Sequence, residues 1–322
     1  MHKEISVIQP EVVTFGESMG LMSAHDSRGL EYASTLHKSF GGAESNVAIG
    51  IARLGHRSGW CGSLGQDPLG TQIYKAIRGE GVDVSRALLS SEAPTGLMIR
   101  ENAYGKSSVY YYRKGSAASQ MRPDQLDASY IQSARILHVT GITAAISPLG
   151  LACVETAMDI ARSAGVKVCF DPNLRLKLWT LEEASPVLLR LAQKCDYFLP
   201  GMDELRLLYG TEDETFIWNE LSKLDAVSIV KGGPDLTYVL EHGTLTEIPY
   251  YKAEQVIDTV GAGDGFCAGF ITGLLKNYSP VEAVRLGSVT GSMVVQAAGD
   301  WEALPTSAQV EALLNHKAHI ER

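Results

Sequence analysis

Residues 258–264 read Asp-Thr-Val-Gly-Ala-Gly-Asp and lead directly into an apolar, helix-like run over residues 265–275. Two glycines separated by one residue allow a tight turn whose backbone N–H groups converge, and a following helix adds the positive end of its dipole. Such a turn is suited to binding an anion, phosphate above all. The stretch therefore predicts a strand-to-helix junction that carries an anion site.

Asp264 ends this turn. A carboxylate beside a phosphate repels it, so the residue needs a task other than binding the anion. It would have one if it takes a proton from a hydroxyl group that attacks the phosphate. The alternative is that Asp264 only caps the helix, as Asp often does. The motif alone leaves both roles open.

The composition restricts the class of protein. The chain has 322 residues, of which 45% are hydrophobic, and a formal net charge of −9. Its length suits one large domain with a small additional substructure. Its negative charge argues against nucleic acid or an anionic membrane as the main partner. Five scattered cysteines in mostly apolar runs predict free, buried thiols and a reducing, cytoplasmic location. We expect neither a signal peptide nor a membrane span.

Short β-like runs alternate with helical patterns along most of the chain. This alternation predicts a doubly wound, Rossmann-like α/β fold, in which helices cover both faces of a mainly parallel sheet. The predicted strands are residues 12–16, 58–64, 136–141, 166–171, 196–199 and 226–230, followed by a hairpin at 238–248. The predicted helices are residues 43–54, 69–79, 149–163, 181–194 and 203–209.

Two segments, residues 21–40 and 94–114, break this rhythm. The alternation of polar and apolar residues in the second predicts antiparallel strands joined at residues 103–106, where Gly105 provides the bend. We expect the two segments to form a small β-sheet lid. Its exposed edge must be covered, so we also expect a homo-oligomer formed through the lid. The remaining segments, residues 11–20, 41–93 and 115–310, would form the α/β catalytic domain.

Further polar clusters lie where such a fold binds ligands. Gly42 and Asn46 belong to a Gly-Gly stretch before a predicted helix, and Asn46 can both donate and accept hydrogen bonds with a hydroxyl group. Lys231-Gly232-Gly233 ends a predicted strand, where it could hold the phosphates or ribose of a nucleotide. The alternative for each cluster is an ordinary turn.

Glu204 follows another predicted strand, at the start of a predicted helix. Magnesium sites use few protein carboxylates and several waters, so Glu204 could act on Mg²⁺ through water. The alternative is a first-turn glutamate that stabilises the helix dipole.

Three residues predict an anionic substrate. Tyr111 and Arg113 project from the same face of a strand in the lid. Arg175 follows the strand that ends at Asp171, and an arginine there can grip a carboxylate with two parallel hydrogen bonds. Each arginine alone is better explained as a surface charge, but together the clusters favour an anion.

With these residues assembled, the chain resembles the ribokinase (PfkB) family of carbohydrate kinases over about residues 11–305. Residues 41–46 are similar to the family's amino-terminal sugar motif, and residues 258–264 to its carboxyl-terminal signature. The resemblance implies a ribokinase-like fold with a β-sheet lid. Residues 41–44, 111–117 and 171–175 are most similar to 2-keto-3-deoxygluconate kinases within the family.

The resemblance implies ATP-dependent phosphorylation of 2-keto-3-deoxy-D-gluconate at O6. By this resemblance, Asp264 would be the base, with Gly261, Ala262 and Gly263 around the transferring group. The sugar hydroxyls would contact Gly42 and Asn46, and the carboxylate and keto end would contact Tyr111, Arg113 and Arg175. ATP would contact Lys231, Gly232, Gly233, Thr259, Gly261 and Gly263, and Glu204 would act on Mg²⁺ through water. Leu21 stands where ribokinase-like members carry an Asp that binds a neutral sugar, which agrees with an acid substrate. The alternatives are a family kinase for 2-keto-3-deoxygalactonate or fructose, and a non-catalytic sensor of a sugar acid or nucleotide.

Overall fold

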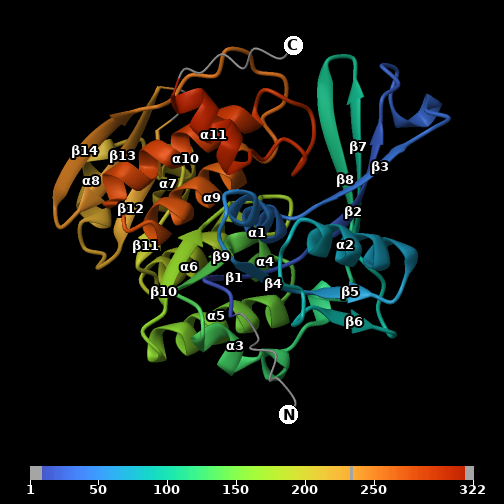
Figure 1. Cartoon of the computed structure of the whole chain (residues 1–322), viewed down its shortest axis with the longest axis horizontal. Coiled ribbons are helices and arrows are strands. Elements are labelled where there is room, and N and C mark those ends of the chain that lie inside the picture. Colours follow the sequence, from blue (N-terminus) through green and yellow to red (C-terminus); the bar gives the residue numbers. More distant parts are fainter. Residues whose placement is uncertain (1–8, 233–234, 316–322) are drawn as a thin grey trace.

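A central eight-stranded sheet organises the molecule (Figure 1). The computed structural model describes residues 9–232 and 235–315. The strands β12, β11, β10, β9, β1 and β4 are parallel to one another, and β13 and β14 add an antiparallel hairpin at the edge next to β12. The predicted doubly wound fold with a mainly parallel sheet is confirmed. In spatial order the strands are β14 (Thr244–Pro249), β13 (Leu236–Glu241), β12 (Val227–Lys231), β11 (Tyr197–Phe198), β10 (Lys167–Asp171), β9 (Ile136–Thr140), β1 (Val12–Phe15) and β4 (Ser58–Cys61).

Helices cover both faces of this sheet because successive strand residues point to opposite sides. Val12 belongs to a buried cluster that contains residues of α1, α9 and α10, whereas Val13 belongs to a cluster that contains residues of α3, α5 and α6, and both side chains are fully buried. The helices are α1 (Ala43–Arg53), α2 (Pro68–Gly79), α3 (Ala128–Gln132), α4 (Gly141–Ala145), α5 (Pro148–Ser163), α6 (Leu181–Ala192), α7 (Met202–Tyr209), α8 (Glu214–Leu221), α9 (Ala262–Leu275), α10 (Pro280–Val294) and α11 (Ser307–Leu314).

A separate four-stranded sheet, in the order β3-β2-β7-β8, stands beside the helices at the upper right of Figure 1. Its strands are β2 (Met19–Ala24), β3 (His37–Gly41), β7 (Leu97–Ala103) and β8 (Lys106–Tyr112). Tyr104 and Gly105 form the predicted turn between β7 and β8, with φ angles of 50° and 75°. The predicted small β-sheet lid is therefore present. Strand β2 begins at Met19, so the lid sheet starts two residues before the expected boundary at residue 21. The division of the chain into two domains stays a prediction.

One strand prediction is wrong in part. Residues 58–64 form two strands, β4 and β5 (Ser63–Gly65), instead of one. β5 leaves the main sheet and pairs with β6 (Leu88–Ser90). Gly62 lies at the break, where a Cβ atom would come within 2.3 Å of the Trp60 ring, so the chain bends where only glycine fits.

Helix starts follow the sequence, with one informative exception. Asp67, Ser147 and Ser279 cap α2, α5 and α10, and each precedes a proline at the first helical position. Helix α9 begins differently, because its N-cap is Gly261 and no side chain of the described residues caps it. The first N–H groups of α9 are therefore available to a ligand.

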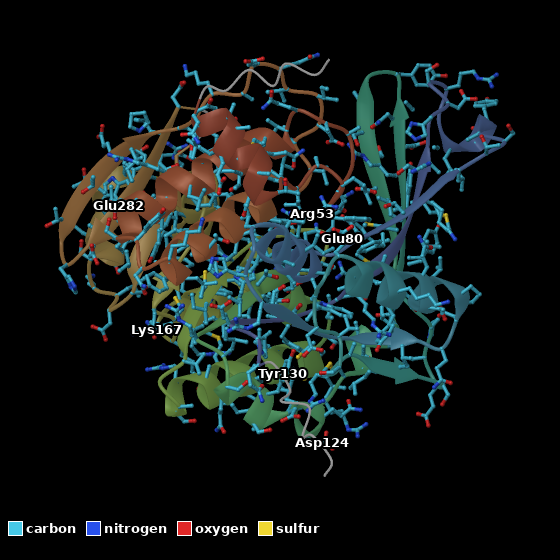
Figure 2. The ribbon with its side chains drawn as sticks, in the orientation of Figure 1. Arg53, Glu80, Asp124, Tyr130, Lys167 and Glu282 are labelled. Atoms are coloured by element: carbon cyan, nitrogen blue, oxygen red, sulfur yellow. The ribbon has the colours of Figure 1, made fainter. Side chains whose placement is uncertain are left out.

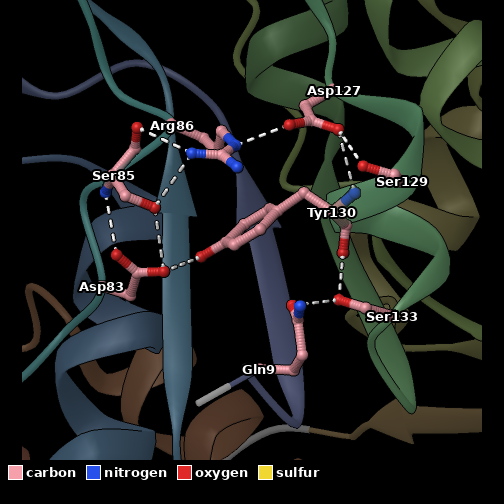
Figure 3. Close-up of polar contacts among 8 residues, drawn as sticks. All are labelled: Gln9, Asp83, Ser85, Arg86, Asp127, Ser129, Tyr130 and Ser133. Atoms are coloured by element: carbon pink, nitrogen blue, oxygen red, sulfur yellow. Dashed lines mark hydrogen bonds and ion pairs between the residues drawn. The ribbon is translucent and has the colours of Figure 1, made fainter. Parts of the chain in front are cut away.

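Polar contacts join the elements near the amino-terminal ends of β1 and β4 (Figure 3). The Tyr130 hydroxyl donates to Asp83 Oδ2 at 2.7 Å, and Arg86 Nε donates to Asp127 Oδ2 at 2.6 Å. These bonds fasten α3 to the segment that follows α2. They lie away from the carboxyl ends of the strands, which leaves that end for ligands.

Two expectations about the whole chain concern thiols and membranes. All five cysteines are free and buried, as predicted. Among residues 9–232 and 235–315, no helix combines the length and apolar content needed to cross a membrane.

Candidate active site

A cavity of about 810 Å³ lies between the lid sheet and the carboxyl ends of the central strands. It collects most of the residues that the sequence predicted: Gly42, Asn46, Tyr111, Arg113, Arg175, Glu204, Lys231, Thr259, Gly261, Gly263 and Asp264 line it. Ala262 and Gly232 are not part of the lining. Gly233 lies outside the described residues.

The turn before α9 forms one side of the cavity. Gly261 has a φ of 77°, and a Cβ atom there would lie 2.2 Å from the carbonyl oxygen of Asp300. Both the left-handed backbone and this close approach require glycine. The turn therefore presents the uncapped start of α9 to the cavity, which is the arrangement that binds phosphate.

Asp264 lies in the first turn of α9, and its side chain accepts a hydrogen bond from Asn46 instead of capping the helix. Asn46 Nδ2 donates to Asp264 Oδ2 at 2.8 Å and to Asp300 Oδ1 at 2.6 Å. One amide group therefore links two carboxyl groups at the floor of the cavity. Asp264 and Asp300 come from segments on either side of α10, so only the fold brings them together.

Both carboxyl groups have raised pKa values. Burial raises the pKa of Asp264 to about 8, and the neighbouring charge of Asp300 adds to the effect. Burial also raises the pKa of Asp300 to about 6, while the hydrogen bond from Asn46 works in the opposite direction. A carboxylate with a raised pKa is a stronger base than an exposed one, so Asp264 is suited to accept a proton near neutral pH.

The segment that carries Asp300 is held by Arg53 at the end of α1. Arg53 donates to the carbonyl oxygen of Leu304 at 2.7 Å and to Glu80 Oε2 at 2.7 Å, and Arg53 and Glu80 lie side by side in Figure 2. Asn46 comes from the same helix. Helix α1 therefore positions both the amide and one of its two carboxyl partners.

Glu17 lies beneath the predicted carboxylate site. It forms an ion pair with Arg113, and its Oε1 accepts a hydrogen bond from the Ser116 hydroxyl at 2.8 Å. The side chain of Glu17 is 1% exposed, so the pair is largely shielded from water. Arg113 thus reaches the cavity with its charge already balanced by a carboxylate.

The other cations of the cavity differ in this respect. Among the described residues, no carboxylate oxygen lies within 4 Å of a side-chain nitrogen of Arg175 or Lys177. Lys177 Nζ donates to the carbonyl oxygen of Val109 in the lid at 3.2 Å and lies 5.9 Å from the centre of the Tyr111 ring. Arg175 and Lys177 therefore bring positive charge that no described carboxylate balances directly.

The apolar part of the lining comes from the lid. Met19, Leu21 and Met98 form a small cluster on the inner face of the lid sheet. Leu21 therefore contributes to an apolar wall of the cavity.

Glu204 has both of its carboxylate oxygens occupied. One accepts the N–H of Gly201 at 2.7 Å, which caps α7, and the other accepts the N–H of Leu174 at 2.7 Å. Burial raises the pKa of Glu204, and the charge of Asp171 acts in the same direction. Glu204 therefore holds the segment that carries Arg175, whichever role it has toward a metal.

Lys231 also lines the cavity, and its Nζ donates to Asp171 Oδ2 at 3.1 Å. The described residues hold no cluster of three side chains of the kind that ligates a metal ion. The few carboxylates here fit Mg²⁺ only in the form in which phosphates and waters supply most of its ligands.

Comparison with known proteins decides the family. Residues 9–307 match the pfkB family of carbohydrate kinases. The chain belongs to this family. The resemblance that the two glycine motifs predicted is thus confirmed.

Similar members of the pfkB family include kinases for sugar acids. The chain is 40% identical to a 2-dehydro-3-deoxygluconokinase of Bacillus subtilis (strain 168), over 97% of this chain and 98% of that protein. It is 31% identical to a 5-dehydro-2-deoxygluconokinase of Shouchella clausii (strain KSM-K16), over 96% and 97% of the two chains. A crystal structure of a PfkB protein from Polaromonas sp. JS666 superposes with a TM-score of 0.86 at 38% identity, covering 94% of this chain and 99% of that one.

Residues of this pfkB cavity that sequence reasoning missed include Glu17, Lys177 and Asp300, and also Arg100. Lys177 lies two residues after Arg175 in the same predicted loop, so the position of the loop could have indicated it. Glu17 follows the first strand, where ligands are expected in this fold, and that location is a usable signal. Asp300 belongs to no motif and is far from Asn46 in the chain, so nothing in the sequence indicated it.

Proposed function

We propose that the chain transfers the γ-phosphoryl group of ATP to O6 of 2-keto-3-deoxy-D-gluconate, which is another name for 2-dehydro-3-deoxy-D-gluconate. One observation carries the proposal: a single cavity contains a base of raised pKa beside an uncapped helix start, and cations near the lid. The name of the Bacillus subtilis relative supports the same substrate.

Asp264 is the proposed base. The O6 hydroxyl group gives its proton to the Asp264 carboxylate while O6 forms a bond to the γ-phosphorus, and the bond from that phosphorus to the bridging oxygen breaks to release ADP. The N–H groups of the turn formed by Gly261, Ala262 and Gly263 stabilise the charge on the transferring group. Asn46 holds the Asp264 carboxyl in place and reaches sugar hydroxyls together with Gly42.

Lys231, Gly232 and Thr259 are the proposed contacts of ATP, with Gly233 beside them in the sequence. Mg²⁺ on the phosphates of the nucleotide neutralises part of their charge. Glu204 faces this end of the cavity and would act on the hydration shell of the ion through water, as its two backbone hydrogen bonds leave its carboxylate in a fixed position.

The carboxylate and keto end of the substrate lies near Tyr111, Arg113 and Arg175 in this proposal. Arg113 and Arg175 both contribute guanidinium donors. Arg113 is paired with Glu17, whereas no carboxylate of the described residues lies within 4 Å of the Arg175 guanidinium nitrogens. An acidic substrate is favoured here over a neutral sugar such as fructose, because it brings the negative charge that Arg175 and Lys177 attract.

The lid also supports a proposal about assembly. Tyr110 and Tyr112 on the edge strand β8 point away from the cavity and are 44% and 61% exposed. We propose that a second copy of the chain covers this edge in a homo-oligomer, which light scattering can measure. A cytoplasmic location agrees with five free thiols and stays a prediction.

The test is ADP release by the purified protein with ATP and Mg²⁺ in the presence of different acceptors. The acceptors are 2-keto-3-deoxygluconate, its galacto epimer, 5-keto-2-deoxygluconate, fructose and ribose. We expect turnover with the 2-keto-3-deoxy acids and at least about tenfold higher kcat/KM than with the neutral sugars, since one charged hydrogen bond is worth that much. Turnover with fructose or ribose alone would contradict the acid clamp, and binding of an acid without ADP release would favour a sensor.

A further inference from the structure

An ion pair connects the lid with the phosphate-binding turn. Arg100, on lid strand β7, donates two hydrogen bonds to Asp258: Nη1 to Oδ2 at 2.7 Å and Nη2 to Oδ1 at 3.0 Å. The two side chains are 17% and 10% exposed. A parallel pair of bonds between partly buried groups fixes the relative orientation of the two residues. Asp258 is the first residue of the motif that leads into α9.

Asp258 also shapes the turn itself. Its Oδ1 accepts the N–H of Val260 at 3.1 Å, the residue directly before Gly261. The same oxygen therefore receives one bond from the turn and one from the lid. Burial works against a charged Asp258, but the hydrogen bonds from Arg100 and Val260 prevail and lower its pKa, so the carboxylate stays ionised near neutral pH.

Arg100 is itself held in place by the lid. Its Nε donates to the Ser107 hydroxyl on the neighbouring strand β8 at 3.3 Å, and Arg100 lines the cavity beside Ser107. A movement of the β7–β8 hairpin would consequently move the guanidinium group away from Asp258. The turn would then lose the partner that fixes its first carboxylate.

We propose that Arg100 is a positioning residue for phosphoryl transfer, which binds Asp258 from the lid and so holds the turn before α9 in the shape that receives the transferring group. This inference rests on the proposed kinase function. Arg100 touches neither the acid site of Arg113 nor the base Asp264 by any hydrogen bond among the described residues. Its effect should therefore appear in the transfer step more than in binding of the acid.

The lid provides a matched control. Arg28 also donates two hydrogen bonds to an aspartate, from Nε to Asp26 Oδ1 at 3.0 Å and from Nη2 to Asp26 Oδ2 at 2.8 Å. This pair lies on the outer part of the lid, and the Arg28 side chain is 62% exposed. Arg28→Met thus removes the same kind of interaction from the connection between lid strands β2 and β3 without touching the turn.

The first measurement is steady-state kinetics of R100M, R100K, D258N and R28M with the accepted sugar acid. We expect R100M to lower kcat about a hundredfold, as misplacement of a reacting group by about 1 Å does, while KM for the acid changes less than about threefold. R100K should recover part of the loss, because lysine keeps the charge but not the parallel bonds. R28M should match the wild type.

The double variant tests whether the two residues act as a pair. D258N keeps one oxygen for the Val260 N–H, but it replaces the other oxygen by an NH2 group and so loses both the charge and one of the two bonds from Arg100. R100M combined with D258N should be no slower than the slower single variant, because a broken pair cannot be broken twice. Effects that multiply, or a kcat of R100M within about threefold of the wild type, would overturn the proposal. A large rise in KM for the acid with unchanged kcat would also overturn it, since that outcome marks a lid that has only become loose.

Amide hydrogen exchange supplies a readout that needs no turnover. The N–H of Val260 should exchange faster in R100M than in the wild type and at the wild-type rate in R28M. Equal protection in R100M and the wild type overturns the proposal. If the wild type phosphorylates no sugar acid, the proposed function fails, whereas the exchange measurement still decides the role of Arg100 in the turn.

Discussion

The floor and the lid of the cavity are built in different ways. On the floor, Asn46 joins Asp264 and Asp300 through hydrogen bonds of 2.8 and 2.6 Å, and α1 and α9 hold the group rigidly. On the lid, Tyr111 comes from the edge strand β8 and Arg113 directly follows it, and the tyrosines beside Tyr111 on this strand are exposed. A rigid floor suits proton transfer, which depends on short distances. A separate lid allows the acceptor to be selected without changing that floor.

The floor and the lid side of the cavity also carry groups of opposite charge. The floor contains two carboxyl groups of raised pKa, and the lid side contributes cations. A sugar acid that binds with its carboxylate toward the lid and its far hydroxyl toward the floor meets complementary charge at both ends. In this orientation the base and the acid clamp would contact different ends of one substrate.

The largest effect is expected on the floor. Asp264→Asn should lower kcat about a hundredfold or more, because it removes the base and keeps an oxygen that can accept the Asn46 bond. KM for the acid should change little. ADP release with the sugar acid measures the loss, and circular dichroism checks that the variant folds. A kcat near that of the wild type would leave Asp264 without its catalytic role.

The next effect is expected at the lid. Arg113→Ala should raise KM for the sugar acid about a hundredfold, because it removes a charged donor and also leaves the buried Glu17 carboxylate unpaired beside an anion. Arg175→Ala should raise KM by a smaller factor, since no described carboxylate loses its partner there.

The second substitution E17Q separates the two parts of this effect. Combined with Arg113→Ala it should restore part of the affinity, because Gln keeps an acceptor for Ser116 and removes the negative charge. Initial rates at varied acid concentration measure KM for the single and double variants. If E17Q does not improve Arg113→Ala at all, Glu17 contributes no repulsion and the ion pair is only structural.

The sequence predicted the elements that local patterns determine. The alternation of strands and helices, the turn at Gly105 and the glycine at the start of α9 all follow from residue type and spacing, and the structure has each of them. It also predicted that Tyr111 and Arg113 share a face of one strand. Both line the cavity, although β8 ends at Tyr112 and Arg113 follows it.

The contacts that depend on distant segments were beyond the sequence. Asp300 meets Asn46 although 254 positions separate them in the chain, and no local pattern reports such a pairing. Leu21 in place of an Asp predicts a sugar site without negative charge, yet Glu17 brings a carboxylate there and Arg113 balances it. Charge at a site is a property of pairs, so single residues in a sequence do not determine it.

The smallest effect is expected on stability: the buried Asp264 carboxyl on the floor should make the free energy of unfolding depend on pH, whereas an exposed carboxyl should not. The folded pKa of Asp264, about 8, lies above the value of about 3.9 for an exposed Asp. Between these values the unfolded chain has released the proton and the folded protein still holds it, so the folded state is favoured less and less as pH rises from about 4 to about 8. Asp264→Asn removes this penalty, because the amide does not ionise.

Asp264→Asn should therefore increase the free energy of unfolding by about 1 to 3 kcal/mol at pH 9 and by much less at pH 5, as urea denaturation at the two pH values can measure. Asp203→Asn is the matched control, because the Asp203 side chain is 94% exposed and should give no such difference. A gain at pH 9 together with the loss of turnover would mean that the floor keeps a destabilising charge for the sake of catalysis. Equal stability of Asp264→Asn and the wild type at both pH values would show that the Asp264 carboxylate is well solvated in the folded protein. Its pKa would then not be raised, and the argument that Asp264 is a strong base would fail.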